Sequence, residues 1–394
     1  MNRLRLHTLA PHLGDEEDDT GVSRPLVAPI YQTSAFSFDD LETADQVQSG
    51  TKAGYIYSRM GNPTIARLEQ ALAQCEGAED ALVTASGMAA ITASMLSLVR
   101  PGERILAGHE LYGGTTGLLK LMGDFGIMVD YVDTSQMESV SSSLNEKTRL
   151  VLAETITNPR VAVADVARLA SCAHAAGAYL MVDNTFATPY HCQPLAQGAD
   201  LVVHSLTKFI GGHGDLTGGV CLGRSEIMDS IRSNATLLGA APDPFAAWLT
   251  LRGMKTLALR MEKSSANALY LAERLRTHSA VEEVYYPGLT AHPTHDVARR
   301  TLNRGFGAMF SLRLKGGTRA AQALVERSRL VRFVPSLGDV ATTLSYPLTT
   351  SHRGLSAHEQ VQLGITGGLI RISTGIEDPR DLWDDLLGAL DAED

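Results

Sequence analysis

Positive charge is scarce in this chain of 394 residues, where 34 lysines and arginines face 44 aspartates and glutamates and the formal net charge is −10. A broad electropositive face for a phosphate backbone is therefore not expected, and no nucleic-acid partner is predicted. Cysteine is scarce too, since only four are present and none of them forms a C-x-x-C pair. That spacing argues against a disulfide framework or a structural zinc site.

Long apolar runs are absent as well. No run approaches the ~18 residues that a membrane span requires, so no membrane partner is expected. The N-terminal segment becomes acidic from Asp15 onward, which is typical of neither a signal peptide nor a transit peptide. We therefore expect a cytoplasmic protein.

Several widespread catalytic motifs are also missing. The sequence has no G-x-G-x-x-G after a strand pattern, no G-x-x-x-x-G-K-[ST], no H-E-x-x-H and no G-x-S-x-G. Nicotinamide dehydrogenases, P-loop NTPases, zincins and α/β-hydrolases become less favoured for this reason. The histidines of the middle part of the chain, His174, His191, His204 and His213, lack the spacing of metal ligands, so no metal is expected.

Aliphatic residues and glycine are plentiful, with 44% hydrophobic residues and 36 glycines. At roughly 150 residues per domain, the length indicates two or three globular domains. Residues 1–60 contain many turn formers and no sustained helical period, which predicts an extended arm with short helical pieces that reaches a neighbouring subunit. Residues 61–255 are predicted to form a large domain, and residues 256–394 a smaller C-terminal α+β domain.

Short apolar runs alternate with helical periods in the predicted large domain, which is typical of an α/β fold with a largely parallel sheet covered on both faces. Its strands are predicted at 81–83, 104–107, 128–132, 150–153, 179–182, 201–203 and 219–222, and its helices from about 62 and at 88–99, 115–125 and 166–176. A long helical stretch from about 244 to 276 is expected to lead into strands at 281–285, 308–314 and 369–372 and helices at 318–327 and 379–390.

Polar residues collect directly after the predicted strands, where the ligands of open parallel sheets bind. Ser86-Gly87-Met88 lies between a strand and a helix, and the backbone N–H groups of such a helix start suit a phosphate, although an ordinary capped turn has the same pattern. Asp183 follows a second strand. Ser205, Thr207 and Lys208 follow a third, so two hydroxyls precede a lysine that can act as an amine when buried.

A fourth strand is followed by Glu154 and Asn158, and a fifth is followed by Tyr112. One sheet edge would therefore carry a lysine, a carboxylate, an aromatic ring and phosphate-binding groups. Pyridoxal 5'-phosphate requires this set: the lysine forms a Schiff base, the aspartate keeps the pyridine nitrogen protonated, and hydroxyls and amides hold the phosphate. An aldolase-like Schiff-base site without a cofactor is the alternative, but it explains neither the phosphate-binding groups nor the aspartate.

Seven ordered blocks carry a resemblance over essentially the whole chain: YIYSRMGNPT at 55–64, SGMA at 86–89, LYGGT at 111–115, DNTFATPY at 183–190, ADLVVHSLTK at 199–208, LRGMKTLALRM at 251–261 and IRISTGIED at 370–378. They resemble the Cys/Met metabolism pyridoxal-phosphate enzymes. This family includes cystathionine γ-synthase, cystathionine β- and γ-lyases, methionine γ-lyase and the O-acylhomoserine sulfhydrylases. The resemblance implies the fold type I of pyridoxal-phosphate-dependent transferases.

The resemblance also implies roles for single residues. Lys208 is similar to the Schiff-base lysine, which also moves protons between substrate carbons, and Asp183 to the partner of the ring nitrogen. Tyr112 resembles the stacking tyrosine that assists proton transfer to the leaving group. The residues implied to bind the rest of the cofactor are Gly87, Met88, Ser205 and Thr207 at the phosphate and Asn158 near the ring hydroxyl. A non-catalytic scaffold of this fold would be expected to lack Lys208 or Asp183, and both are present.

Four more residues resemble parts of the family's site. Tyr57 and Arg59 are similar to the pair that reaches the phosphate of the neighbouring subunit, which implies an active site completed in a dimer, commonly within a homotetramer built as a dimer of dimers. Arg371 resembles the residue that clamps the substrate α-carboxylate, for which a planar guanidinium is suited. Ser336 resembles a second carboxylate contact.

Departures from the family pattern bear on the reaction. Gly114 stands where methionine γ-lyases usually carry a cysteine, Pro335 where cystathionine γ-lyases often carry a glutamate, Ala341 where a charged residue is common, and Ile156 where a proline is usual. The loss of charge favours a thioether such as methionine, homocysteine or cystathionine over a charged acyl ester. We therefore predict γ-elimination that yields a thiol, ammonia and 2-oxobutanoate, with γ-replacement on an activated homoserine and then β-elimination as alternatives.

Overall fold

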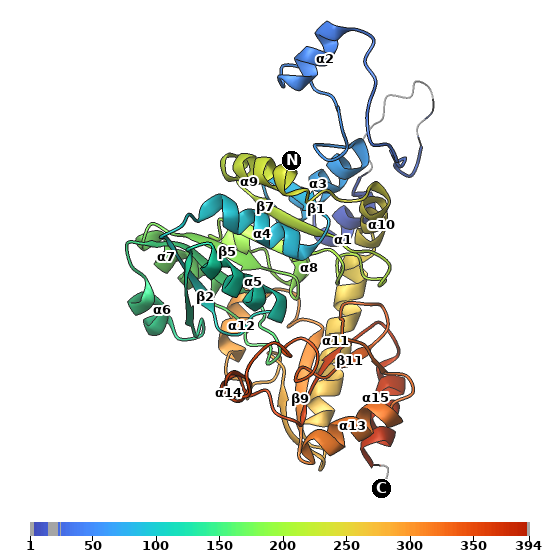
Figure 1. Cartoon of the computed structure of the whole chain (residues 1–394). Coiled ribbons are helices and arrows are strands. Elements are labelled where there is room, and N and C mark those ends of the chain that lie inside the picture. Colours follow the sequence, from blue (N-terminus) through green and yellow to red (C-terminus); the bar gives the residue numbers. More distant parts are fainter. Residues whose placement is uncertain (1–3, 15–22, 24, 392–394) are drawn as a thin grey trace.

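The computed structural model describes residues 4–14, 23 and 25–391, which form two sheets (Figure 1). The first sheet has seven strands in the order β1-β7-β6-β5-β4-β2-β3. Its strands are β1 Asp80–Thr84, β2 Arg104–Gly108, β3 Met128–Val132, β4 Thr148–Glu154, β5 Tyr179–Asp183, β6 Leu201–Ser205 and β7 Gly219–Gly223. All seven predicted strands are therefore present.

The first sheet is mostly parallel, as predicted. β3, β2, β4, β5 and β6 pair in parallel, whereas β7 runs antiparallel to both β1 and β6. Alternate residues of each strand enter opposite cores, so Val151 and Ala153 lie in one core and Leu150 and Leu152 in the other. The helices packed on the Leu150 side are α4 Gly87–Leu98, α5 Gly113–Asp124 and α9 Ser225–Leu238, and on the Val151 side α3 Pro63–Glu76 and α7 Val166–Ala175.

The second sheet has the strand order β10-β11-β12-β9-β8. Its strands are β8 Val281–Tyr285, β9 Met309–Leu314, β10 Arg332–Phe333, β11 Thr343–Ser345 and β12 Leu369–Ser373. The helices α11 Leu257–Leu275, α13 Gly317–Arg327 and α15 Pro379–Asp391 share a buried core with this sheet, in which Phe310 and Ile370 are fully buried. An α+β arrangement thus follows the parallel sheet along the chain. The domain boundaries proposed at residues 60 and 255 stay predictions.

The helical stretch predicted at about 244–276 is helical but consists of two helices, α10 Pro244–Met254 and α11 Leu257–Leu275. The carbonyl oxygen of Gly253 accepts hydrogen bonds from the Thr256 backbone N–H at 3.2 Å and from Nη2 of Arg260 at 2.8 Å. A continuous helix would require this oxygen for the N–H of Leu257. Arg260 also donates to the carbonyls of Phe209 and Ile210, so the helix break anchors the loop that contains Lys208.

The remaining helices are short or were not predicted. They are α1 Leu6–Leu9, α2 Leu41–Gln48, α6 Met137–Ser143, α8 Thr188–His191, α12 His295–Thr301 and α14 Ala357–Gln362, with 3-10 turns at Ala10–His12 and Pro194–Gln197. The predicted arm contains α1 and α2, and α2 stands away from both sheets (Figure 1). Residues 1–3, 15–22 and 24 of that arm, and residues 392–394 at the other end, lie outside the described residues. No helix of the described part has the length and apolar content to cross a bilayer.

Candidate active site

A cavity of about 400 Å³ lies at the carboxyl ends of β4, β5 and β6, where the second sheet approaches the first. Ten of the twelve predicted site residues line it: Gly87, Met88, Tyr112, Asn158, Asp183, Ser205, Thr207, Lys208, Ser336 and Arg371. A hollow of about 630 Å³ at the opposite edge of the first sheet contains none of them. The predicted edge of the sheet is therefore where the chemistry-bearing side chains meet.

One end of the cavity is rich in hydrogen-bond donors. Ser86 caps α4 by accepting a bond from the Ala89 N–H at 3.1 Å, and the N–H groups of Gly87 and Met88 begin the helix, where no helical carbonyl can accept them. A Cβ on Gly87 would lie only 3.0 Å from Cβ of Ser205, so glycine lets that serine approach the helix start. The donors and the helix dipole together suit a phosphate group.

Asp183 ends β5 at the centre of the cavity. Its Oδ1 accepts a hydrogen bond from the Thr185 N–H at 2.9 Å. Burial raises the pKa of Asp183, although the hydrogen bonds from Thr185 and the nearby His204 act in the opposite direction. A buried carboxylate is stabilised by a cation that contacts it, and the protonated nitrogen of a pyridine ring is such a cation. The donor-rich end and Asp183 together therefore fit pyridoxal 5'-phosphate.

Lys208 lies on the loop after β6 and donates a hydrogen bond from Nζ to Oγ of Ser336 at 2.8 Å. Burial lowers the pKa of this lysine to about 8, and the positive charge of Arg371 contributes in the same direction. A neutral amine is the form that attacks a carbonyl or accepts a proton. The site thus makes the reactive form of Lys208 far more abundant at a given pH than it is in an ordinary lysine.

Arg371 lies inside β12, within the strand predicted at 369–372, and is buried. Its Nη1 donates to Oδ1 of Asn158 at 2.8 Å, and its Nη2 to the backbone oxygen of Ser336 at 3.4 Å. Burial lowers the pKa of Arg371 to about 10, while the neighbouring Glu154 favours its charged form. The guanidinium remains a cation that an anionic substrate group can approach from the cavity.

Glu154 is a member of the site to which the sequence pattern assigned no role. It pairs in register with Asp183 on the neighbouring strand, and its Oε1 accepts a hydrogen bond from the Tyr112 N–H at 2.6 Å. Burial raises the pKa of Glu154 well above its usual range, and the charge of Asp183 adds to this. Its position at a strand end was visible in the sequence, whereas its neighbour across the sheet was not. The turn residues Thr350 and Ser351, which also line the cavity, had no sequence signal.

Tyr112 and Gly114 lie together at the start of α5. The side chain of Tyr112 is half exposed, at 46% of its full accessible surface. A Cβ on Gly114 would collide with the Tyr112 ring, so the absence of a side chain at Gly114 allows this ring position.

Tyr57 and Arg59 do not line the cavity. Nη1 of Arg59 donates to the backbone oxygen of Thr236 at 3.2 Å, and its guanidinium carbon lies 5.7 Å from the centroid of the Tyr57 ring. Both residues are exposed. The structure therefore does not bring this pair to the site of its own chain, and a role in the neighbouring subunit stays a prediction.

Within the described ranges, no group of three or more histidine, cysteine or acidic side chains is placed to hold a metal ion.

Comparison with known proteins agrees with the cofactor that the site residues fit. The family model described as "Cys/Met metabolism PLP-dependent enzyme" matches residues 7–391. The chain is 40% identical to an L-methionine gamma-lyase of Fusobacterium nucleatum subsp. polymorphum, with 97% of this chain and 96% of the relative covered. It is 42% identical to an O-succinylhomoserine sulfhydrylase of Pseudomonas aeruginosa, over 92% of this chain and 90% of the relative. A cystathionine gamma synthase from Xanthomonas oryzae pv. oryzae, solved with aminoacrylate and cysteine, superposes with a TM-score of 0.92 at 37% identity, and 98% of each chain is covered.

Replacement of Gly219 by alanine should weaken cofactor binding. The added Cβ would collide with the carbonyl oxygen of Ser86 and lie 2.6 Å from the Gly87 nitrogen, which displaces the start of α4. We expect the dissociation constant of pyridoxal phosphate, measured by absorbance titration of the apoprotein, to rise about tenfold, which corresponds to ~1.4 kcal/mol. Gly117→Ala is the matched control, because nothing lies within 4 Å of its added Cβ. Equal affinities of the two variants would contradict the expectation.

The amine of Lys208 should become reactive at an unusually low pH. In the apoprotein its labelling by acetic anhydride, followed by peptide mapping, should reach half of its maximum near pH 8, because the amine is protonated below that pH and neutral above it. Arg371→Gln removes the smaller of the two causes and should move the midpoint upward, while burial still holds it below the pKa of 10.5 of an ordinary lysine. A midpoint at 10.5 in the unaltered apoprotein would be inconsistent with the buried position of Lys208.

Proposed function

Because this chain belongs to the Cys/Met metabolism family of pyridoxal-phosphate-dependent enzymes, we propose that it catalyses γ-elimination of a sulfur amino acid. Methionine, homocysteine and cystathionine are the proposed substrates. Water is consumed, the Cγ–S bond breaks, and the products are a thiol, ammonia and 2-oxobutanoate. The observation that carries this proposal is the shared cavity of Lys208, Asp183, Tyr112 and Arg371.

Pyridoxal phosphate, when bound, supplies an electron-accepting ring that stabilises negative charge at the substrate carbons. Gly87, Met88, Ser205 and Thr207 would hold its phosphate, and Asp183 its ring nitrogen. Asn158 would contact its ring hydroxyl, and Lys208 would bond to its aldehyde carbon.

The other steps belong to side chains of this chain. Arg371 binds the α-carboxylate of the substrate and thereby orients its Cα–H bond toward the cavity. The neutral amine of Lys208 accepts the proton from Cα and transfers protons between neighbouring carbons. Tyr112, which lines the cavity and is half exposed, donates the proton that the departing sulfur requires.

Charge in the cavity supports a substrate with a neutral γ-substituent. Among the described lining residues, Lys208 and Arg371 are the only lysine and arginine. If the first binds the cofactor and the second the α-carboxylate, this chain offers no further such cation to a distal carboxylate. A methyl thioether or a free thiol requires none. The charges that line the cavity therefore favour methionine or homocysteine over a succinyl ester.

The alternative is γ-replacement on an O-acylhomoserine or a related activated four-carbon amino acid. The 42% identity to an O-succinylhomoserine sulfhydrylase favours it. The two reactions share the residues that bind the cofactor and differ in whether a thiol enters after the first leaving group has departed. β-Elimination of cystathionine is the third candidate.

The arm supports a proposed assembly of several subunits. Leu26 is 91% and Leu41 90% exposed in the single chain, and Tyr57 and Met60 are exposed as well. Apolar side chains with this exposure are covered at low cost when a second copy packs on them. We propose a homotetramer built as a dimer of dimers, in the cytoplasm, with an arm at 1–60, a cofactor-binding domain at 61–255 and a small domain at 256–394.

The keto acid identifies the reaction. The protein, loaded with pyridoxal phosphate, should release 2-oxobutanoate from L-methionine or L-cystathionine, with one ammonia and one thiol for each keto acid, as chromatography and thiol titration would measure. Lys208→Ala should lower this rate about 10³-fold, because a positioned proton-transfer group is lost. Pyruvate would refute γ-elimination. A product formed only from an acylhomoserine and an added thiol would establish the alternative.

The proposed partner role of Tyr57 and Arg59 predicts complementation between inactive chains. Arg59→Ala and Lys208→Ala homo-oligomers should each have low activity, whereas mixed dimers should recover about one good site of the two, since one site then combines an intact Lys208 with an intact Arg59. Subunits can be mixed by denaturation and refolding or by coexpression with two tags. A mixture of Lys208→Ala with Lys208→Met is the control, which should show no recovery because neither chain supplies Lys208. If the first mixture also stays inactive, Arg59 does not serve the neighbouring subunit.

A further inference from the structure

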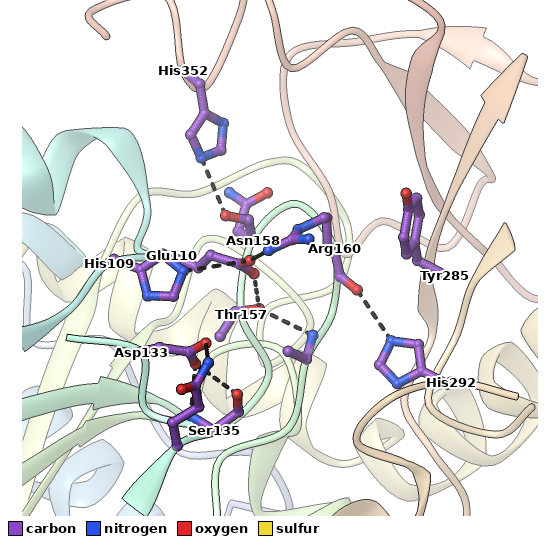
Figure 2. Close-up of polar contacts among 12 residues, drawn as sticks. His109, Glu110, Asp133, Ser135, Thr157, Asn158, Arg160, Tyr285, His292 and His352 are labelled. Carbon is purple, nitrogen blue, oxygen red and sulfur yellow. Dashed lines mark hydrogen bonds and ion pairs between the residues drawn. The ribbon is translucent and has the colours of Figure 1, made fainter. Parts of the chain in front are cut away.

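A turn from the second half of the chain forms one wall of the active-site cavity. Thr350 and Ser351 line the cavity, and the next residue, His352, is 1% exposed. Its Nε2 lies 3.1 Å from the backbone oxygen of Asn158, a bond that connects this turn to the segment after β4 (Figure 2). His352 itself is not among the described residues that line the cavity, so any influence on the substrate must pass through a neighbour.

The hydrogen bonds of His352 define its tautomer. A carbonyl oxygen can only accept, so Nε2 carries the proton and donates to Asn158. Nδ1 lies 2.8 Å from Oγ of Ser351, which donates to it. Burial lowers the pKa of His352 to about 4, and the charge of Arg371 contributes in the same direction. The ring is therefore a neutral, singly protonated connector with both nitrogens bonded.

Asn158 connects His352 to the proposed carboxylate-binding residue. Its backbone oxygen accepts from His352, and its side-chain Oδ1 accepts from Nη1 of Arg371 at 2.8 Å. Asn158 is 1% exposed and Arg371 4%, so water does not replace either bond easily. A shift of the Asn158 backbone would consequently move the acceptor that orients the guanidinium.

The segment after β4 that contains Asn158 is also held by a buried polar group on the loop after β2. Thr157 donates from its hydroxyl to Oε2 of Glu110 at 2.7 Å and accepts from the Ala162 N–H at 3.0 Å. Glu110 also pairs with Arg160, so the segment that contains Asn158 is anchored to the loop after β2 (Figure 2). His352 anchors this segment to the second half of the chain together with Ser311, whose hydroxyl donates to the carbonyl oxygen of Pro159. The position of Asn158 is therefore determined by contacts from both parts of the structure.

We propose that His352 is a positioning residue for Arg371: it holds the backbone of Asn158, and the Asn158 side chain holds the guanidinium in the orientation that binds the substrate α-carboxylate. This inference rests on the proposed role of Arg371. Bidentate recognition of a carboxylate requires a fixed guanidinium plane, so a small rotation weakens binding without removing the charge. Loss of the His352 bond should affect substrate binding more than the proton transfers at Lys208.

The test uses the enzyme loaded with pyridoxal phosphate and L-methionine as substrate. His352→Phe keeps an aromatic ring but has no donor, and it should raise KM about tenfold, which is ~1.4 kcal/mol, while kcat falls less than about threefold. His352→Gln retains an N–H donor and should restore most of the binding. His174→Phe, at the opposite edge of the first sheet, should leave both parameters unchanged. Should the phenylalanine variant fail to fold, His352→Leu takes its place with the same expectation.

A double-mutant cycle with Arg371→Gln separates this inference from the proposed function. If His352 acts through Arg371, His352→Phe should add little to the KM of the Arg371→Gln enzyme, because the group that it positions is already gone. An Arg371→Gln enzyme with unchanged KM would refute the carboxylate-binding role itself. A raised KM in Arg371→Gln but not in His352→Phe would overturn the inference alone. Equal loss of kcat, cofactor affinity and thermal stability without rescue by glutamine would also overturn it, because it would mean a merely structural role.

Discussion

The parallel pairing of β4, β5 and β6 is the constraint on which the site depends. It places Glu154 directly beside Asp183 and brings Ser205 to the same edge. Side chains at paired positions of neighbouring strands point to the same face, so two carboxylates enter one buried space. They are tolerated because burial holds Glu154 toward its neutral form and because the cation Arg371 faces Glu154 from β12.

Opposite shifts in the pKa of these four groups follow from the same desolvation. Burial disfavours every isolated charge, so it raises the pKa of Glu154 and Asp183 and lowers that of Lys208 and Arg371. An unpaired charge in such a space would cost several kcal/mol. Burial therefore brings the pKa values of the acidic and the basic groups closer to one another, which is the property that proton-transfer catalysis requires.

The second sheet completes the site by holding its parts in place. Arg260 on α11 donates to the carbonyls of Phe209, Ile210 and Gly253, and thereby anchors the loop after Lys208. Arg371 reaches from β12 to Asn158, and Ser336 accepts from Lys208. Catalytic geometry here depends on contacts between distant segments, since Arg371 lies 213 positions from Asn158 and Ser336 lies 128 positions from Lys208. A change in either sheet is therefore felt at the same cavity.

Local pattern was sufficient for much of the fold and for the polar residues that follow the strands of the first sheet, whereas Arg371 and Ser336 were predicted from the family resemblance. Apolar runs of strand length and polar residues at their ends predict the parallel sheet, and Lys208, Asp183 and Ser205 follow because ligands bind at the carboxyl ends of such strands. The break between α10 and α11 was not predictable in this way, because it is stabilised by bonds of Arg260 to Phe209 and Ile210, which lie 51 and 50 positions away. The pairing of Glu154 with Asp183 and the contact of His352 with Asn158 were decided only by the tertiary structure, since each joins residues whose proximity no periodicity or spacing encodes.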